Sequence, residues 1–204
     1  MRREPSLANG YERVATQFLE GRGSAATAAR GIGVRQVRAW ARSLPSDATV
    51  LELGCGPGLP ITSVLVGAGL TVYGVDASPT LVAAFRRNLP GAVVACEAVE
   101  TSSFFGRAFD AVLAWGLWFL LPGAAQLELP GRVAKILRPG GRLLFTAPPQ
   151  PTTWLDVMTG EESRSLGAPT YRQSLAAAGL SVAQEYEDEG ENHYYDAVKV
   201  VATS

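Results

Sequence analysis

The chain has 204 residues, 47% of them apolar, and a net charge of −1, which is typical of one domain with its own core. No apolar run approaches the roughly 20 residues that a membrane helix needs, and the start MRREPSLANG lacks the apolar core of a signal peptide. The near-neutral charge argues against a broad electrostatic grip on nucleic acid. We therefore expect a soluble, cytoplasmic protein with no membrane contact.

Cysteine and histidine are scarce. Cys55 and Cys96 lie in separate segments without CxxC spacing, and the chain has a single histidine. These numbers argue against a disulfide framework and against any metal site. No His or Lys lies near either thiol to lower its pKa, so both cysteines are expected to be small packed residues.

Two amphipathic helices are predicted at the start of the chain, over 11–22 and 33–44, joined by a glycine-rich connection over 21–31. Residues 1–42 hold eight arginines against three glutamates. This excess fits either a solvated helix face or an anion-binding cap. We predict that residues 1–44 form an N-terminal helical cap, part of the same domain as residues 45–204.

Strand-length apolar runs then alternate with helical patterns. The predicted strands are ATVLEL, TVYGVD, AVVAC, FDAVLAW and RLLFTA. Between them, one helix is predicted to begin near Leu59, a second to begin at Pro79 and a third to end near Leu137. This rhythm predicts a parallel sheet with helices on both faces. Ser78 is expected to cap the helix that Pro79 begins, because proline at the first helical position loses no hydrogen bond.

Two further features concern the later part of the chain. Pro130 and Gly131 are expected to break or restart the helix that contains them. A strand is predicted over about 180–187 and a last strand from His193, joined by the polar turn DEGEN. These two strands must be antiparallel, because a parallel return needs a long crossover. The predicted fold is a doubly wound, mostly parallel α/β sheet with its last strand antiparallel.

The glycine-rich segment VLELGCGPG follows a predicted strand and indicates a nucleotide site. A dinucleotide loop reads GxGxxG, whereas this one reads GxGxG, and the expected third glycine position falls on Leu59 or Ile61. Pro57 also removes one backbone N–H from the loop, which suits a ligand without a pyrophosphate. A ligand without phosphates is therefore favoured.

Five segments in order carry a resemblance: ELGCGPG, VYGVDAS, CEA, FDAVLAWG and LRPGGRLLFTAP. Over about residues 48–204 the chain resembles the seven-stranded, Rossmann-like class I S-adenosylmethionine (SAM)-dependent methyltransferases, whose last strand is also reversed. The resemblance implies SAM as cofactor and S-adenosylhomocysteine (SAH) as product.

The resemblance also implies which residues bind the cofactor. Glu52 and the loop of Gly54, Cys55, Gly56 and Gly58 would meet the methionyl part. Asp76, followed by Ala77, would bind the ribose hydroxyls. Glu97 and Ala98 would lie at the adenine, although related proteins more often have Asp at the position of Glu97. Trp115 would lie beside the methionine end.

The acceptor side is less determined. No NPPY-type motif of base or glutamine methylation is present, which favours a small-molecule acceptor whose O, N or S is methylated. Methyl transfer from a sulfonium is an in-line displacement, so alignment dominates, and His193 is the candidate general base. The candidates for shaping the acceptor pocket are Tyr11, Trp154, Asp156, Tyr194 and Tyr195.

Three other functions stay open from the sequence. The chain could bind SAM for regulation without transferring a methyl group. It could be a nucleotide-dependent oxidoreductase, against which the missing third glycine argues. RNA methylation would require the arginines of the first 42 residues to form one basic face.

Overall fold

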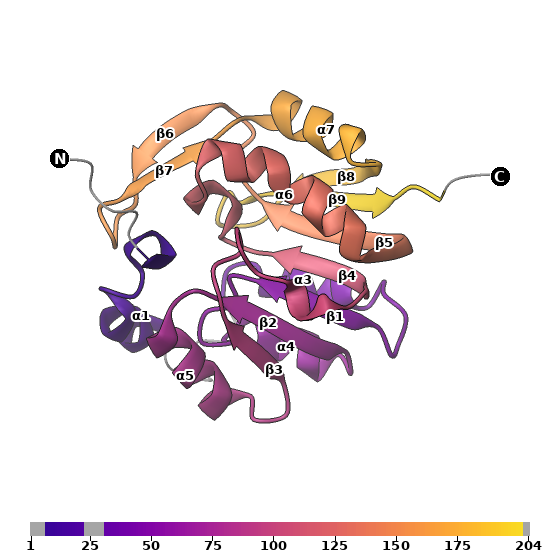
Figure 1. Ribbon diagram of the computed structural model, residues 1–204. Coiled ribbons are helices and arrows are strands. Elements are labelled where there is room, and N and C mark those ends of the chain that lie inside the picture. The colour runs from indigo at the N-terminus through magenta and orange to yellow at the C-terminus, as the bar shows by residue number, and fades with distance from the viewer. Residues whose placement is uncertain (1–6, 23–30, 202–204) are drawn as a thin grey trace.

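The computed structural model describes residues 7–22 and 31–201. A seven-stranded sheet forms its centre (Figure 1), in the order β3-β2-β1-β4-β5-β9-β8. Its strands are β1 (Thr49–Leu53), β2 (Thr71–Asp76), β3 (Val93–Cys96), β4 (Phe109–Ala114), β5 (Leu137–Thr146), β8 (Leu180–Glu187) and β9 (His193–Lys199). The strand order changes direction between β1 and β4, which is where open α/β sheets bind ligands.

The strand directions confirm the predicted sheet. Strands β1 to β5 pair in parallel, whereas β9 is antiparallel to both β5 and β8. The short connection over 188–192 explains the reversal, since it cannot cross the sheet. The turn therefore lies at the carboxyl end of β8, the same edge as the carboxyl ends of β1, β2 and β4.

Helices cover both faces of the sheet. The helices are α1 (Ala15–Arg22), α3 (Val34–Ala41), α4 (Ile61–Gly67), α5 (Pro79–Asn88), α6 (Gly123–Ile136) and α7 (Ala168–Ala177), with the 3-10 turns η1 (Leu7–Gly10), η2 (Phe104–Gly106) and η3 (Trp118–Leu120). Alternate strand residues enter two cores: Phe145 and Tyr195 pack on the α6 and α7 side, and Leu144 and Tyr194 on the α3 and α4 side. This period of two is that of a strand buried on both faces.

The predicted cap of α5 is confirmed. The Ser78 side chain accepts a hydrogen bond from Leu81 N, with Pro79 in the first turn. At the N-terminus, α1 begins at Ala15 because residues 11–14 form a turn. The greater part of the predicted glycine-rich connection, residues 23–30, lies outside the described residues, as do Arg2, Arg3 and Arg30. The boundary between residues 44 and 45 stays a prediction.

The predicted break at Pro130 is wrong. Helix α6 continues through Pro130 and Gly131. A proline inside a helix costs about 3 kcal/mol. Here it lies on a buried face with Leu129 and Val133, and burial of such side chains contributes roughly 1.5–3 kcal/mol each. Tertiary packing therefore outweighs the local preference.

A second, two-stranded sheet was not predicted. Strands β6 (Thr152–Leu155) and β7 (Glu162–Ser165) form an antiparallel hairpin that lies apart from the main sheet, beside the N-terminal segment (Figure 1).

Among the described residues, no helix is both long and apolar enough to cross a bilayer. The cytoplasmic location stays a prediction.

Candidate active site

A cavity of about 550 Å³ opens at the carboxyl ends of β1, β2 and β4. It is lined by the glycine loop and by segments from both ends of the chain. Of the residues predicted for the site, these line it: Tyr11, Glu52, Gly54, Cys55, Gly56, Asp76, Ala77, Ala98, Trp115 and Asp156. A volume of several hundred Å³ suits a small organic ligand. The structure thus brings most of the predicted cofactor residues to one place.

The glycine loop turns tightly between β1 and α4. Gly54 N donates to Val75 O at 2.8 Å, and Gly56 N donates to Asp76 Oδ2 at 2.8 Å. Gly56 has φ +53°, a left-handed conformation that favours glycine, and a Cβ there would meet no atom within 4 Å. The loop backbone at Gly56 therefore faces open space in which a ligand can approach closely.

Asp76 is a buried carboxylate held by the loop. Its Oδ1 accepts a hydrogen bond from Ser78 N at 2.9 Å, while its Oδ2 accepts the bond from Gly56 N. Burial raises the pKa of Asp76, and the two backbone hydrogen bonds act in the opposite direction. Each carboxylate oxygen has a second lone pair, so Asp76 can accept further bonds from hydroxyl groups.

Glu52 is the second buried carboxylate of the cavity, with 3% of its surface exposed. Its Oε2 has no hydrogen-bond partner among the described residues. Burial raises the pKa of Glu52 to about 8; the Thr62 side chain acts in the opposite direction, and the negative charge of Asp76 raises it. A buried carboxylate with an oxygen that lacks a partner is costly unless it is protonated or meets a cation. Glu52 is therefore suited to a positively charged ligand group.

The N-terminal segment crosses the mouth of the cavity. The Glu12 carboxylate accepts hydrogen bonds from the Ser78 hydroxyl and from Thr80 Oγ1, the latter at 2.7 Å. The Ser78 hydrogen bond is the main reason that the pKa of Glu12 is lowered. This contact fixes the segment to the N-terminus of α5, two residues beyond Asp76.

On its other side the same segment contacts the β6–β7 hairpin. Tyr11 OH donates to Asp156 Oδ2 at 3.1 Å, and Arg13 Nη2 donates to Thr159 O at 2.7 Å. The segment thus joins α5 to the hairpin across the cavity. This explains how Tyr11 and Asp156 come to line one site although they are far apart in sequence.

The structure places several predicted residues outside the cavity lining. Glu97 is exposed, and Glu100 lines the cavity instead. Gly58 does not line it either, because its Cα faces the side chains of Leu89 and Phe85. Contrary to the expectation that Cys96 is packed, its side chain is exposed, whereas Cys55 is buried and burial raises the pKa of its thiol.

The predicted acceptor residues are similarly divided. Trp154 lies behind Phe119, with ring centroids 5.4 Å apart, and only Phe119 lines the cavity. Tyr195 is fully buried in the opposite core, stacked on Phe145. Tyr194 is also fully buried, one layer behind Trp115. None of these three side chains contacts the cavity directly.

His193 does not reach the cavity. Its Nε2 lies 3.0 Å from Glu185 Oε2 and its Nδ1 lies 3.4 Å from Glu187 Oε1, so the ring is held between two carboxylates of β8. The turn that precedes it does lie at the site, since Asn192 lines the cavity. The turn lies at the predicted edge of the sheet, and the residue of that turn that lines the cavity is Asn192.

Sequence reasoning missed lining residues that come from distant segments. They include Asn9, Phe18, Leu117, Phe119, Leu120 and Asn192. The apolar run WGLWFLL after the strand over 109–115 was a possible signal for three of them. No group of residues in the described part of the chain is arranged to hold a metal ion.

The comparisons with known proteins agree with this geometry. A family model described as a methyltransferase domain matches residues 50–141. An uncharacterized methyltransferase of Mycobacterium tuberculosis is 38% identical over 101 residues, which are 49% of this chain and 40% of that protein. The trans-aconitate 2-methyltransferase of Methylobacterium nodulans is 36% identical over 149 residues, 68% of this chain and 52% of that protein. The chain thus spans about half or less of the length of these curated relatives.

Solved structures show the same fold. The CcbJ methyltransferase from Streptomyces caelestis superimposes with a TM-score of 0.75 at 15% identity, covering 97% of this chain and 100% of that one. A Burkholderia thailandensis 1,6-didemethyltoxoflavin-N1-methyltransferase, solved with bound 1,6-didemethyltoxoflavin and S-adenosylhomocysteine, gives a TM-score of 0.69 at 21% identity, covering 98% of this chain and 94% of that one. With the sequence model matched over residues 50–141, the strand order and the loop, the chain contains a methyltransferase domain and has the seven-stranded fold of these methyltransferases.

Proposed function

We propose that this protein transfers a methyl group from SAM to O, N or S of a small molecule. One observation carries the proposal: two buried carboxylates, Glu52 and Asp76, face one cavity beside a glycine loop that leaves open space at Gly56. SAM offers an ammonium group to Glu52 and two ribose hydroxyls to Asp76. Its adenine has a place at Ala98 and Val99, which also line the cavity.

The chemical work divides between ligand and protein. When bound, SAM supplies a methyl group on a positively charged sulfur and leaves as SAH. The residues of this chain bind SAM and the acceptor, orient them and exclude water from the site. These tasks are most of what an in-line transfer requires. Asn9 and Tyr11 of the N-terminal segment line the cavity, and Trp115 and Leu117 also border it. We assign no proton-transfer role to His193, because its ring is engaged with Glu185 and Glu187.

The lining also limits the acceptor. Among the described residues it contains the carboxylates Glu52, Asp76, Glu100 and Asp156 but no Lys, Arg or His. Phe18, Phe119 and Leu120 add apolar surface. An acceptor with several carboxylates, such as the one named for the Methylobacterium nodulans relative, would lack a cationic partner there. We therefore propose an acceptor with an apolar body that is uncharged or cationic.

Methyl transfer can be tested directly. The protein would be incubated with SAM labelled in its methyl group and with fractionated small-molecule extracts, and the label followed by mass spectrometry. Asp76→Ala serves as the matched blank. We expect label in an uncharged or basic metabolite with the native chain, and much less with Asp76→Ala.

The outcomes separate the alternatives. Binding of SAH without label transfer to any fraction would favour a regulatory SAM-binding protein. Label in RNA, with binding that weakens steeply with salt, would favour RNA methylation. Label in a polycarboxylate would contradict the proposed acceptor class while leaving methyl transfer intact.

A further inference from the structure

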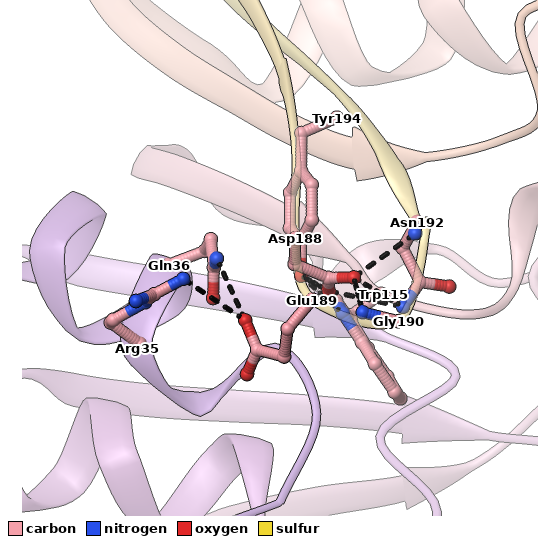
Figure 2. Close-up of polar contacts among 8 residues, drawn as sticks. All are labelled: Arg35, Gln36, Trp115, Asp188, Glu189, Gly190, Asn192 and Tyr194. Atoms are coloured by element: carbon pink, nitrogen blue, oxygen red, sulfur yellow. Dashed lines mark hydrogen bonds and ion pairs between the residues drawn. The ribbon is translucent and has the colours of Figure 1, made fainter.

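Four residues form a chain of hydrogen bonds whose two ends both line the cavity (Figure 2). Trp115 Nε1 donates to Tyr194 OH at 2.8 Å, and Tyr194 OH donates to Asp188 Oδ2 at 2.8 Å. Asn192 Nδ2 donates to the same carboxylate at 3.0 Å. Trp115 and Asn192 line the cavity, whereas Tyr194 and Asp188 are buried behind them.

The two middle members of this chain of hydrogen bonds, Tyr194 and Asp188, are well anchored. Asp188, 8% exposed, also accepts hydrogen bonds from the backbone of Gly190 at 2.9 Å and of Asn192 at 3.0 Å. Hydrogen bonds to a carboxylate are about twice as strong as neutral ones. Burial first, and the Asp188 hydrogen bond second, raise the pKa of Tyr194, so its hydroxyl stays protonated and remains a donor.

The same turn is fixed from outside. Glu189 accepts hydrogen bonds from Arg35 Nη2 and Gln36 Nε2, both at 3.2 Å, which ties the turn to α3 (Figure 2). Gly33, just before α3, packs against the hydrogen bond between Trp115 and Tyr194: a Cβ at Gly33 would lie 2.5 Å from Trp115 Nε1. The indole is therefore confined both by its hydrogen bond and by the backbone that passes over it.

We propose that Tyr194 and Asp188 are positioning residues, which hold Trp115 and Asn192 as one rigid wall of the cavity. Through this wall the β8–β9 turn fixes the indole beside the site for the methionine end of the ligand. The coupling within the protein is independent of the proposed function. Its consequence for ligand affinity rests on that function.

A purely structural role for Tyr194 predicts something different. Loss of its hydroxyl would then lower global stability and affect all parts of the core alike. A positioning role predicts an effect confined to Trp115 and to the ligand. The chain offers a matched control, because the ring of Tyr186 stacks on that of Tyr194 at 5.0 Å and its hydroxyl makes no hydrogen bond to a described residue.

The experiment compares Tyr194→Phe with Tyr186→Phe. Hydrogen exchange of the Trp115 indole N–H is measured by NMR, the resonance being assigned as the one absent from Trp115→Phe. Trp118, fully buried, provides the internal reference. We expect exchange at Trp115 to be roughly two- to tenfold faster in Tyr194→Phe, the effect on the indole of losing its neutral hydrogen bond to the Tyr194 hydroxyl, with no change in Tyr186→Phe or at Trp118.

Calorimetric titration with SAH is the second measurement. We expect the Kd of Tyr194→Phe to rise by a similar factor, about two- to tenfold, and that of Tyr186→Phe to stay at the native value. Equal acceleration at Trp115 and Trp118, or unchanged exchange at Trp115, would overturn the proposal. If the native chain does not bind SAH, the proposed function fails, and the exchange result still decides the coupling.

Discussion

The two halves of the cavity are built in different ways. The half that we assign to the cofactor comes from consecutive strand ends, with Glu52, Gly56 and Asp76 within 25 residues of sequence. The half left for the acceptor joins the N-terminal segment, the β6–β7 hairpin and the β8–β9 turn, for which the Tyr11 to Asp156 hydrogen bond spans 145 positions. The first half is determined by local sequence, and the second depends on how distant segments pack. Each prediction below tests one half.

The largest effect is expected in the cofactor half, at Asp76. Asp76→Ala removes the carboxylate that we propose accepts the ribose hydroxyls, and losing such charge-assisted bonds costs on the order of 1.5 to 3 kcal/mol. The Kd for SAH should rise by about 10- to 150-fold, measured by calorimetry. Asp110→Ala, which removes a partly buried carboxylate at the opposite end of the sheet, is the control. Native affinity in Asp76→Ala would leave that residue as a loop anchor only.

A second prediction concerns the charge of Glu52. Its pKa of about 8 in the folded protein lies above the ordinary value of 4.5 for a glutamate. The folded state therefore retains a proton that the unfolded chain releases, and this contribution to stability is lost as the pH rises from about 4.5 to beyond 8. In thermal melts without ligand, Glu52→Gln should gain stability relative to the native chain over that range.

Ligand binding should instead favour the ionised form of Glu52. If the ammonium of SAH meets the Glu52 carboxylate, binding at pH 7 releases close to one proton. Calorimetry in buffers of different ionisation enthalpy measures that number. Glu52→Gln should release none, and equal proton release in both chains would show that Glu52 does not face the cation.

The N-terminal segment should have a moderate effect. Glu12→Gln weakens the bonds to Ser78 and Thr80 and should lower the free energy of unfolding by about 0.5 to 2 kcal/mol, the usual range for a helix-capping contact. SAH should also dissociate faster, as stopped-flow measurements would show. Glu20→Gln, an exposed change on α1, should alter neither. Because the pKa of Glu12 is lowered, its contribution is present near pH 7 and is lost as the pH falls through that lowered value.

The smallest effect is expected for His193. A general base at this position would contribute about 10²-fold or more to methyl transfer. Since the ring lies between Glu185 and Glu187 and not in the cavity, His193→Ala should change kcat by less than about threefold. Steady-state turnover of the labelled acceptor measures this. A hundredfold loss would return His193 to the reaction.

The same contrast explains what could be predicted from the sequence. The positions of Ser78, Asp76 and the glycine loop follow from local rules for strand ends, caps and turns. The β8–β9 reversal follows from the length of one connection. By contrast, the continuity of α6 through Pro130 depends on burial of its neighbours in the core, which no local rule contains.

Side-chain direction was the other limit. The sequence places His193, Tyr194 and Tyr195 in one strand but does not determine which of these side chains face the cavity. Alternation along β9 sends Tyr194 and Tyr195 into opposite cores, and only Asn192 of the turn lines the cavity. Asn9 and Phe18 were missed because their placement depends on the contacts of Glu12 and Arg13 with distant segments.

The most direct test of the central claim is a calorimetric titration of the native chain with SAH and, separately, with NAD. The account predicts that SAH binds at one site per chain, and that NAD gives no binding heat, because the loop lacks the third glycine of a dinucleotide site. Binding of NAD without binding of SAH would contradict the assignment of this cavity to a methyl donor.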